Sequence, residues 1–136
     1  MPTVLITGTS TGFGRVATEL LAARGWRVFA TMRDLARKEP LERALKEAGL
    51  SERVTFVQLD VTDPSSIEAA VESVLAQTGN TLDAVVHNAG IAVAGVLEDL
   101  SDDDIRRVME TNFLGVLNLT RALLPTFRAQ RHGRIV

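Results

Sequence analysis

The chain has 136 residues, 46% of them hydrophobic and 24% charged, with a formal net charge of −2 and no cysteine. That length suits one domain with a real core, and the composition excludes a disordered chain, disulfide bonds, thiolate metal sites and a basic nucleic-acid-binding surface. No apolar run approaches the roughly 20 residues of a membrane-spanning helix and no basic leader precedes Thr3, so we expect a cytoplasmic protein that binds neither nucleic acid nor membrane.

Predicted strands and helices alternate along the whole chain. Short apolar runs predict strands over residues 3–7, 27–31, 54–59 and 82–86, with a fifth beginning at 133–136. Apolar residues at helical spacing predict helices over 15–24, 41–48, 64–77, 101–109 and 113–129. This order predicts an α/β fold with a doubly wound parallel sheet, the Rossmann fold, in one domain over residues 1–136 that is truncated at the start of its fifth strand.

Residues at two predicted helix starts fit this order. Asp63 before Pro64 is typical of an N-cap followed by proline in the first turn. Ser101 and Asp104, three residues apart, resemble a capping box with a shorter acid. The acidic run 102–104 is therefore interpreted as first-turn residues that complement the helix dipole, not as a metal site.

A glycine-rich segment separates the first predicted strand from the first helix. It is Gly8-Thr9-Ser10-Thr11-Gly12-Phe13-Gly14, with the spacing G-x-x-x-G-x-G. Glycines permit a tight turn and close backbone approach to a pyrophosphate, and the following helix offers free N–H groups and the positive end of its dipole. The alternative is a turn that needs glycine only for chain geometry, and the absence of a Gly-Lys-Ser/Thr ending argues against a P-loop.

Arg33 follows the second predicted strand, 19 residues beyond Gly14, where this architecture places the residue that meets the adenosine ribose. An acid there would bind the ribose 2′-hydroxyl and repel a 2′-phosphate, whereas arginine offers a planar charged fork to the phosphate. We therefore predict NADP (NADPH) as the cofactor, ahead of NAD. The neighbouring Asp34 complicates this prediction, and a solvated surface arginine is the alternative.

Three more polar positions follow later strands or lie in a predicted helix. Asp60 with Val61 ends the third strand, Asn88-Ala89-Gly90 ends the fourth, and Asn112 stands among helix-forming residues. Each has a simpler interpretation from the residues alone. Asp60 can cap the next helix, Asn88 can be a turn residue in left-handed geometry, and Asn112 can be solvated or can bond its own helix backbone.

Together these segments resemble the short-chain dehydrogenase/reductase (SDR) family. Thr7 to Gly14 resembles its glycine motif, Leu59-Asp60-Val61-Thr62 its acid after the third strand, Asn88-Ala89-Gly90 its Asn-Ala-Gly, and Asn112-Phe113-Leu114-Gly115 the helix motif that carries the asparagine of the catalytic tetrad. Residues 28–34 are similar to NADP-preferring members of the hydroxysteroid and retinol dehydrogenase type. The NAD-selecting acid of the family would align with Met32.

The resemblance implies an NADP-dependent oxidoreductase that transfers hydride between nicotinamide and a small-molecule carbonyl or alcohol substrate, without implying which one. The implied cofactor-binding residues are Gly8, Thr9, Ser10, Gly12, Phe13, Gly14, Arg33, Asp60, Val61, Asn88, Ala89 and Gly90. The implied catalytic residue is Asn112, whose counterpart in the family holds a water in the proton relay. A homodimer or homotetramer paired through the helix 113–129 is implied as well, and the alternative is that this helix buries its apolar face in the core.

The rest of the family's catalytic set does not occur in these residues. The family uses a serine, a tyrosine and a lysine four residues after the tyrosine, but the chain has no tyrosine, and its lysines, Lys38 and Lys46, lie at the second predicted helix. Residues 133–136 resemble the start of the strand that leads to the serine. We therefore expect these 136 residues alone to be inactive, to bind cofactor weakly, and to be marginally stable and prone to aggregate.

Two alternatives from other classes stay open. One is a dinucleotide-binding or regulatory module without chemistry, and the other is a methyltransferase-like fold that binds a different adenosine ligand. The histidines do not suggest a further site. His87 ends an apolar strand and is interpreted as a hydrogen-bonded core or rim residue, and His132 lies in a surface turn, with no third ligand at metal spacing.

Overall fold

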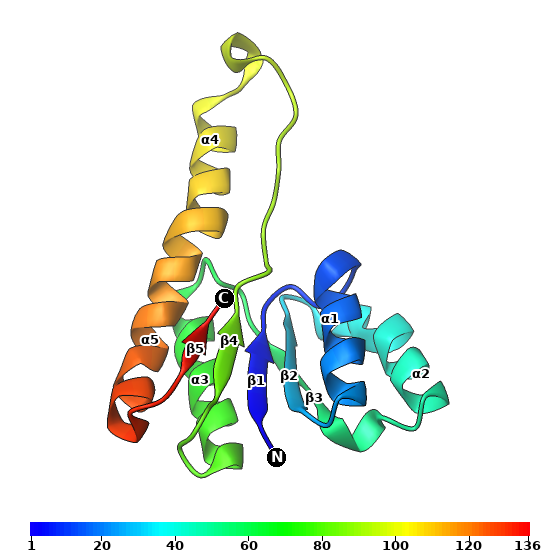
Figure 1. Ribbon diagram of the computed structural model, residues 1–136. Coiled ribbons are helices and arrows are strands. Elements are labelled where there is room, and N and C mark those ends of the chain that lie inside the picture. Colours follow the sequence, from blue (N-terminus) through cyan, green and yellow to red (C-terminus); the bar gives the residue numbers. More distant parts are fainter.

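A computed structural model describes all 136 residues. Five parallel strands form one sheet in the order β3-β2-β1-β4-β5, and helices cover both of its faces (Figure 1). The strands are β1 (Thr3–Ile6), β2 (Arg27–Met32), β3 (Val54–Gln58), β4 (Ala84–Val86) and β5 (Arg134–Ile135). The helices are α1 (Gly12–Ala23), α2 (Glu39–Glu47), α3 (Pro64–Thr78), α4 (Asp102–Met109) and α5 (Gly115–Gln130). The predicted doubly wound parallel α/β sheet is confirmed.

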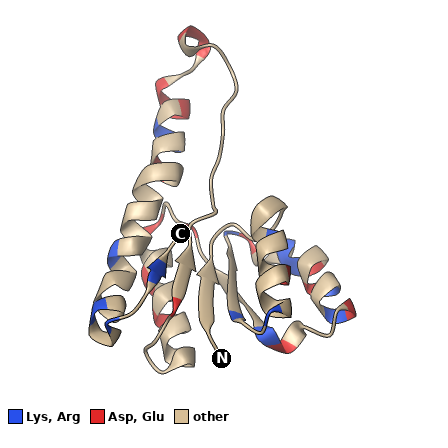
Figure 2. Ribbon diagram, viewed as in Figure 1, with Lys and Arg blue, Asp and Glu red and all other residues tan.

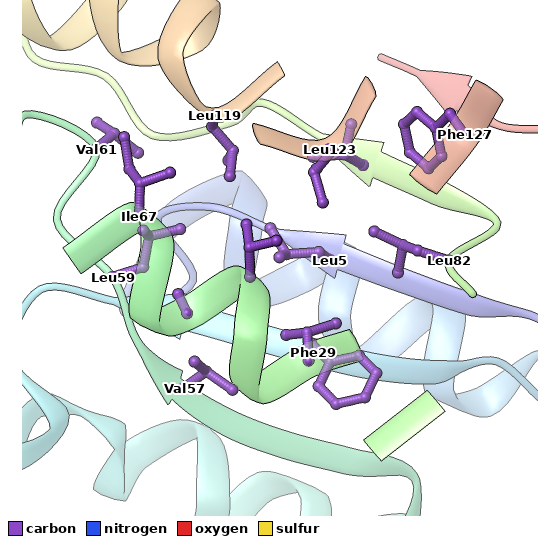
Figure 3. Packing of buried hydrophobic residues seen from close by; sticks show 14 residues of the cluster. Leu5, Phe29, Val57, Leu59, Val61, Ile67, Leu82, Leu119, Leu123 and Phe127 are labelled. Atoms are coloured by element: carbon purple, nitrogen blue, oxygen red, sulfur yellow. The ribbon is translucent and has the colours of Figure 1, made fainter. Parts of the chain in front are cut away.

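The central strand β1 divides its side chains between two separate hydrophobic cores. Leu5 joins the core on the face covered by α3 and α5, where it packs with Phe29 and Leu119 (Figure 3). Val4 and Ile6 join the core on the face covered by α1 and α2. Successive strand residues point to opposite faces, so a strand covered on both sides is apolar throughout. This is why the strands show no polar alternation in the sequence.

The two predicted N-caps are present at the starts of α3 and α4. The Asp63 carboxylate accepts a hydrogen bond from the Ser65 N–H at 2.9 Å, and the Ser101 hydroxyl oxygen accepts one from the Asp104 N–H at 3.1 Å. The Asp104 carboxylate, one methylene shorter than glutamate, accepts from the Ser101 hydroxyl at 2.6 Å instead of from a backbone N–H. This hydrogen bond holds the pKa of Asp104 below its usual value.

The predicted break between the helices 101–109 and 113–129 is wrong. α4 and α5 continue into each other through a π-helical turn, Glu110–Leu114, and form one long helix (Figure 1). A π turn contains an extra residue, which shifts the apolar positions out of the 3.6-residue register without ending the helix. The first helix, α1, begins at Gly12, three residues before its predicted start at residue 15. The prediction was wrong because glycine has low helix propensity.

The segment after β4 and the helix α4 extend beyond the carboxyl edge of the sheet as a projecting arm, residues 92–109 (Figure 1). Its exposed apolar side chains include Val96, Leu97 and Ile105. Acidic residues lie at the far end of this arm (Figure 2), and the first turn of α4 contributes Asp102, Asp103 and Asp104. None of the helices has the length and apolar character that crossing a bilayer requires.

Candidate functional site

A hollow of about 640 Å³ lies at the carboxyl ends of β1, β2, β3 and β4. Residues that follow each of these strands line it, together with one residue of the π-helical turn. The lining residues are Thr7, Gly8, Ser10, Thr11, Phe13, Met32, Arg33, Asp34, Arg37, Leu59, Asp60, Val61, Thr62, Asn88, Ala89, Gly90, Ile91 and Thr111. In doubly wound sheets, ligands bind at this edge, where the strand order reverses. We call this cavity the carboxyl-edge hollow.

Asn88 fixes the glycine-rich loop against the end of β4. Its Nδ2 donates to the carbonyl oxygens of Thr7 and Gly8, both at 2.9 Å. The Thr7 hydroxyl oxygen accepts the backbone N–H groups of Asn88 and Ala89 at 3.0 and 2.9 Å. Asn88 does not have a positive φ. The alternative of a left-handed turn residue is therefore wrong, and the side chain connects two strand ends.

Two of the loop glycines are required by this close packing. Gly8 has a φ of +70°, and a Cβ on it would lie 2.8 Å from the Ala89 Cα. A Cβ on Gly14 would overlap the Asn88 Nδ2 and the Gly8 carbonyl oxygen. Gly12 differs, because its φ is +60° but nothing lies within 4 Å of the place a Cβ would take. The loop therefore packs closely on one side and leaves open space at the start of α1.

The start of α1 lacks the side-chain cap that α3 and α4 have. Thr11 occupies the N-cap position, but its side chain accepts no hydrogen bond, and no acidic residue lies in the first turn. The first N–H groups of a helix have no partner within the helix, so here they stay available to a ligand. Ser10 and Phe13, whose side chain is 87% exposed, line the hollow beside them. Free N–H groups at the positive end of a helix dipole suit a phosphate.

The end of β2 brings two arginines to the hollow. Arg33 and Arg37 both line it, and neither forms an ion pair. Asp34, between them, accepts the Ala36 N–H at 2.9 Å and caps the 3₁₀ helix η1 (Leu35–Lys38). The Met32 side chain is 3% exposed. An apolar residue thus stands where an NAD-selecting acid would align, and the carboxylate of the neighbouring Asp34 is already hydrogen-bonded.

The Asp60 carboxylate organises the turn after β3. It accepts the N–H and the hydroxyl of Thr62 at 2.9 and 2.7 Å, while the Asp60 N–H donates to the Ser66 hydroxyl oxygen at 2.9 Å. The α3 helix is capped by Asp63 instead. The alternative of Asp60 as the helix cap is therefore wrong. Asp60 and the buried Val61 lie on the hollow.

Asn112 lies in the π-helical turn and forms hydrogen bonds with the backbone of Ile91. Its Oδ1 accepts the Ile91 N–H and its Nδ2 donates to the Ile91 carbonyl oxygen, both at 2.8 Å. It does not bond the backbone of its own helix, so that alternative is wrong. Asn112 does not line the hollow, but it holds Ile91, which does.

His87 is a hydrogen-bonded rim residue, as predicted. Its Nε2 lies 3.0 Å from the Thr120 hydroxyl oxygen, and burial lowers the pKa of the imidazole. His132 lies at the surface with its Nε2 3.5 Å from the Asp83 carboxylate. No group of three or more histidine, cysteine or acidic side chains is placed to hold a metal ion.

Most of the predicted cofactor-binding residues line the hollow, but Thr9, Gly12 and Gly14 do not. Thr9 is buried, and its N–H and hydroxyl donate to the Thr31 carbonyl oxygen at 3.0 and 3.1 Å, so neither group remains for a phosphate. Nine lining residues were not among the predicted cofactor-binding ones, and Thr7 and Arg37 are two of these. Thr7 begins the segment that resembles the glycine motif but was assigned only to the predicted strand 3–7, and Arg37 depends on a 3₁₀ helix that helical periodicity does not reveal.

Comparisons with known proteins identify the family. The family described as short chain dehydrogenase matches residues 2–136. The chain is 35% identical to a 3-ketodihydrosphingosine reductase of Bacteroides thetaiotaomicron, over 98% of this chain and 45% of that protein. It is 39% identical to retinol dehydrogenase 8 of Bos taurus, over 98% of this chain and 43% of that protein. A short-chain dehydrogenase structure from Streptomyces avermitilis has a TM-score of 0.87 at 34% identity, over 98% of this chain and 47% of that one.

The chain belongs to the short-chain dehydrogenase family, which consists of oxidoreductases that bind nicotinamide dinucleotides. This membership overturns the methyltransferase-like alternative. The chain spans a little under half the length of the two curated relatives, 45% and 43%.

Proposed function

We propose that residues 1–136 form one NAD(P)-binding domain that holds NADP, as the cofactor-binding part of an oxidoreductase acting on a small-molecule carbonyl or alcohol. The observation that carries this proposal is the carboxyl-edge hollow, which gathers the ends of four parallel strands around about 640 Å³. The protein groups present fit a dinucleotide phosphate. Open space at Gly12, an uncapped first turn of α1 and two guanidinium groups without ion pairs offer donors to anions.

Each part of the hollow is assigned to one part of the cofactor. The start of α1 takes the pyrophosphate through backbone N–H groups. Arg33 takes the 2′-phosphate as a planar donor. Asp60 and the backbone of Val61 hold the adenine. Ala89 and Gly90 form the floor beneath the ribose that carries the nicotinamide.

The preference for NADP over NAD rests on the charges at the end of β2. Met32 presents no carboxylate to the ribose hydroxyls, and the Asp34 carboxylate is bound to the Ala36 N–H. Hydrogen bonds to charged groups contribute about 1.5–3 kcal/mol, which corresponds to roughly tenfold or more in affinity. Loss of Arg33 is therefore expected to weaken NADPH binding by about tenfold and to leave NADH binding nearly unchanged.

The chain orients the cofactor, and another part of the protein completes the reaction. Bound NADP supplies or accepts the hydride. Asn112 holds Ile91 at the edge of the hollow, and we assign it the tetrad role of the family as well. No tyrosine occurs in these 136 residues. We therefore place the serine, tyrosine and lysine of the family in a further segment and expect these residues alone not to turn over substrate.

We also propose that the whole protein is a homodimer or homotetramer paired through the long helix of α4 and α5. Ile105, Met109 and Phe113 are exposed apolar side chains along it. Its first turn is acidic, Asp102–Asp104, and its last turn carries Arg128. Two antiparallel copies would bring these opposite charges together. Light scattering of the wild type and of Met109→Glu tests this, and a monomeric wild type would overturn it.

The experiment that tests cofactor binding is calorimetric titration of the natural protein with NADPH and with NADH. We expect tighter binding of NADPH, and a loss of about tenfold in Arg33→Ala. Arg43→Ala is the matched control, because Arg43 pairs with Glu39 and lies outside the hollow. Equal affinities for the two cofactors, or unchanged NADPH affinity in Arg33→Ala, would overturn the preference. Oxidation of NADPH by a panel of ketones and aldehydes distinguishes an oxidoreductase from a module without chemistry.

A further inference from the structure

The 3₁₀ helix η1 carries a second cation to the hollow. It spans Leu35–Lys38 and directly follows the end of β2. Arg37, within it, is exposed and lines the same hollow as Arg33. The pyrophosphate, the adenine and the ribose floor are bound by other residues, so none of them requires Arg37. Like charges on one concave surface repel each other, so the position of Arg37 beside Arg33 needs a physical reason.

Arg37 has no ion-pair partner, although acidic side chains are close in the sequence. Lys38 pairs with Glu42 at 3.0 Å, and Arg43 pairs with Glu39 at 2.6 Å. Arg37 and Arg33 form no such pair. Two like charges on one concave surface repel each other, and an anion between them removes that repulsion. The arrangement therefore favours a ligand with localised negative charge at this end of the hollow.

Asp34 sets the direction of the chain between the two arginines. Its carboxylate accepts the Ala36 N–H at 2.9 Å, and its carbonyl oxygen accepts the Arg37 N–H at 3.1 Å. These two bonds form the first turn of η1 and bring Arg37 back over the hollow that Arg33 lines. A carboxylate beside a phosphate site weakens anion binding by repulsion. Asp34 therefore opposes anion binding by its charge and supports it by its hydrogen bond.

We propose that Arg37 is a second cationic contact to the 2′-phosphate of NADP and that Asp34 is a positioning residue that holds Arg37 there. This inference rests on the proposed binding of NADP. Arg33 and Arg37 then donate to one phosphate from two segments of the chain. Each guanidinium supplies paired charge-assisted hydrogen bonds in a fixed planar geometry, which neither an ammonium nor a neutral side chain reproduces.

Two probes that differ by one phosphate test the role of Arg37. Adenosine 2′,5′-bisphosphate and adenosine 5′-monophosphate are titrated into the natural protein. Arg37→Ala is expected to weaken the bisphosphate about three- to tenfold, as for a partly exposed charge pair, and to leave the monophosphate unchanged. The control Arg43→Ala is expected to change neither affinity.

A pair of substitutions separates the charge of Asp34 from its hydrogen bond. Asp34→Asn and Asp34→Ala remove the same charge, but only Asn keeps an oxygen that can accept the Ala36 N–H. We expect Asp34→Asn to bind the bisphosphate as tightly as the wild type or tighter, and Asp34→Ala to bind it more weakly than Asp34→Asn. In the Arg37→Ala background, the two substitutions are expected to have the same effect. Equal affinities of Asp34→Asn and Asp34→Ala in the wild-type background would overturn the positioning role.

The outcomes also separate this inference from the proposed function. If the wild type binds both probes equally, the proposed preference for NADP fails. If the wild type prefers the bisphosphate and Arg33→Ala loses that preference while Arg37→Ala keeps it, the cofactor assignment stands and the role of Arg37 is overturned.

Discussion

The Asn112 side chain and the backbone of Ile91 form a closed pair of hydrogen bonds, each 2.8 Å long, across 21 residues of sequence. An amide side chain both donates and accepts, so it can bind the N–H and the carbonyl oxygen of one residue together. The pair joins the π-helical turn to the segment after β4, where Ile91 lines the hollow. The turn and the rim of the hollow are therefore held as one unit.

Asn112→Ala is expected to destabilise the fold by about 1–2 kcal/mol, because two hydrogen bonds are lost and the N–H and carbonyl oxygen of Ile91 are left without their partner. Amide hydrogen exchange measured by NMR should show faster exchange at Ile91. Asn112→Asp keeps an acceptor for the Ile91 N–H but places a carboxylate oxygen opposite the Ile91 carbonyl oxygen, so it should protect the Ile91 N–H only in part. Asn118→Ala, on the same long helix and without a side-chain hydrogen bond, is the control. Unchanged Ile91 exchange in Asn112→Ala would show that the contact is not formed in solution.

Asn88→Asp is expected to cost about 3 kcal/mol or more, because it replaces a donor with a carboxylate oxygen facing the Thr7 and Gly8 carbonyl oxygens. Urea unfolding measures the loss, with Asn118→Asp as the control. Lowering the pH should restore part of the stability as the new carboxyl group takes up a proton and can donate again. A variant with the stability of the wild type at neutral pH contradicts the assigned role of the amide.

Gly14→Ala and Gly12→Ala are expected to differ strongly. A methyl group at Gly14 overlaps the Asn88 amide and the Gly8 carbonyl, which costs about 3 kcal/mol or more and displaces the loop. A methyl group at Gly12 meets nothing, so only the strain of a φ of +60° remains, about 1 kcal/mol. Urea midpoints of the two variants check this ordering. Equal midpoints would mean that the loop packs less closely than described.

The strands were predictable because burial on both faces leaves a continuous apolar run, and β1 and β2 lie within one residue of their predicted ends. The continuity of α4 and α5 could not be predicted, because the π-helical turn changes the helical register between Glu110 and Leu114. In the site, residues inside motifs, such as Asn88 and Asp60, were found. Arg37 was not predicted as a residue of the site, because its position follows from the hydrogen bond that Asp34 makes in the folded chain.

His87 is expected to make stability depend on pH. Burial lowers its pKa below the ordinary value of 6.5, so the unfolded chain takes up a proton more readily than the folded one. The stability that neutral His87 provides is therefore fully present above the unfolded pKa and is lost as the pH falls through the lowered folded pKa. Urea unfolding at about pH 7.5 and 5.5 measures this loss against the linkage expectation.

His87→Gln should reduce that loss, because glutamine can bond Thr120 without titrating. His132→Gln, at an exposed position, is the matched control. Identical pH dependence in the wild type and His87→Gln would assign the effect to other groups.

The hydrogen bonds between Thr7 and Asn88 join residues 81 positions apart in the chain. Contacts of such long sequence separation close a large loop of chain, and their entropy cost must be met before they stabilise anything. During synthesis, the glycine-rich loop therefore leaves the ribosome long before the amide that gives it its shape. The cofactor can bind only chains whose fourth strand has already packed into the sheet. Its binding therefore stabilises the completed sheet and no earlier folding intermediate.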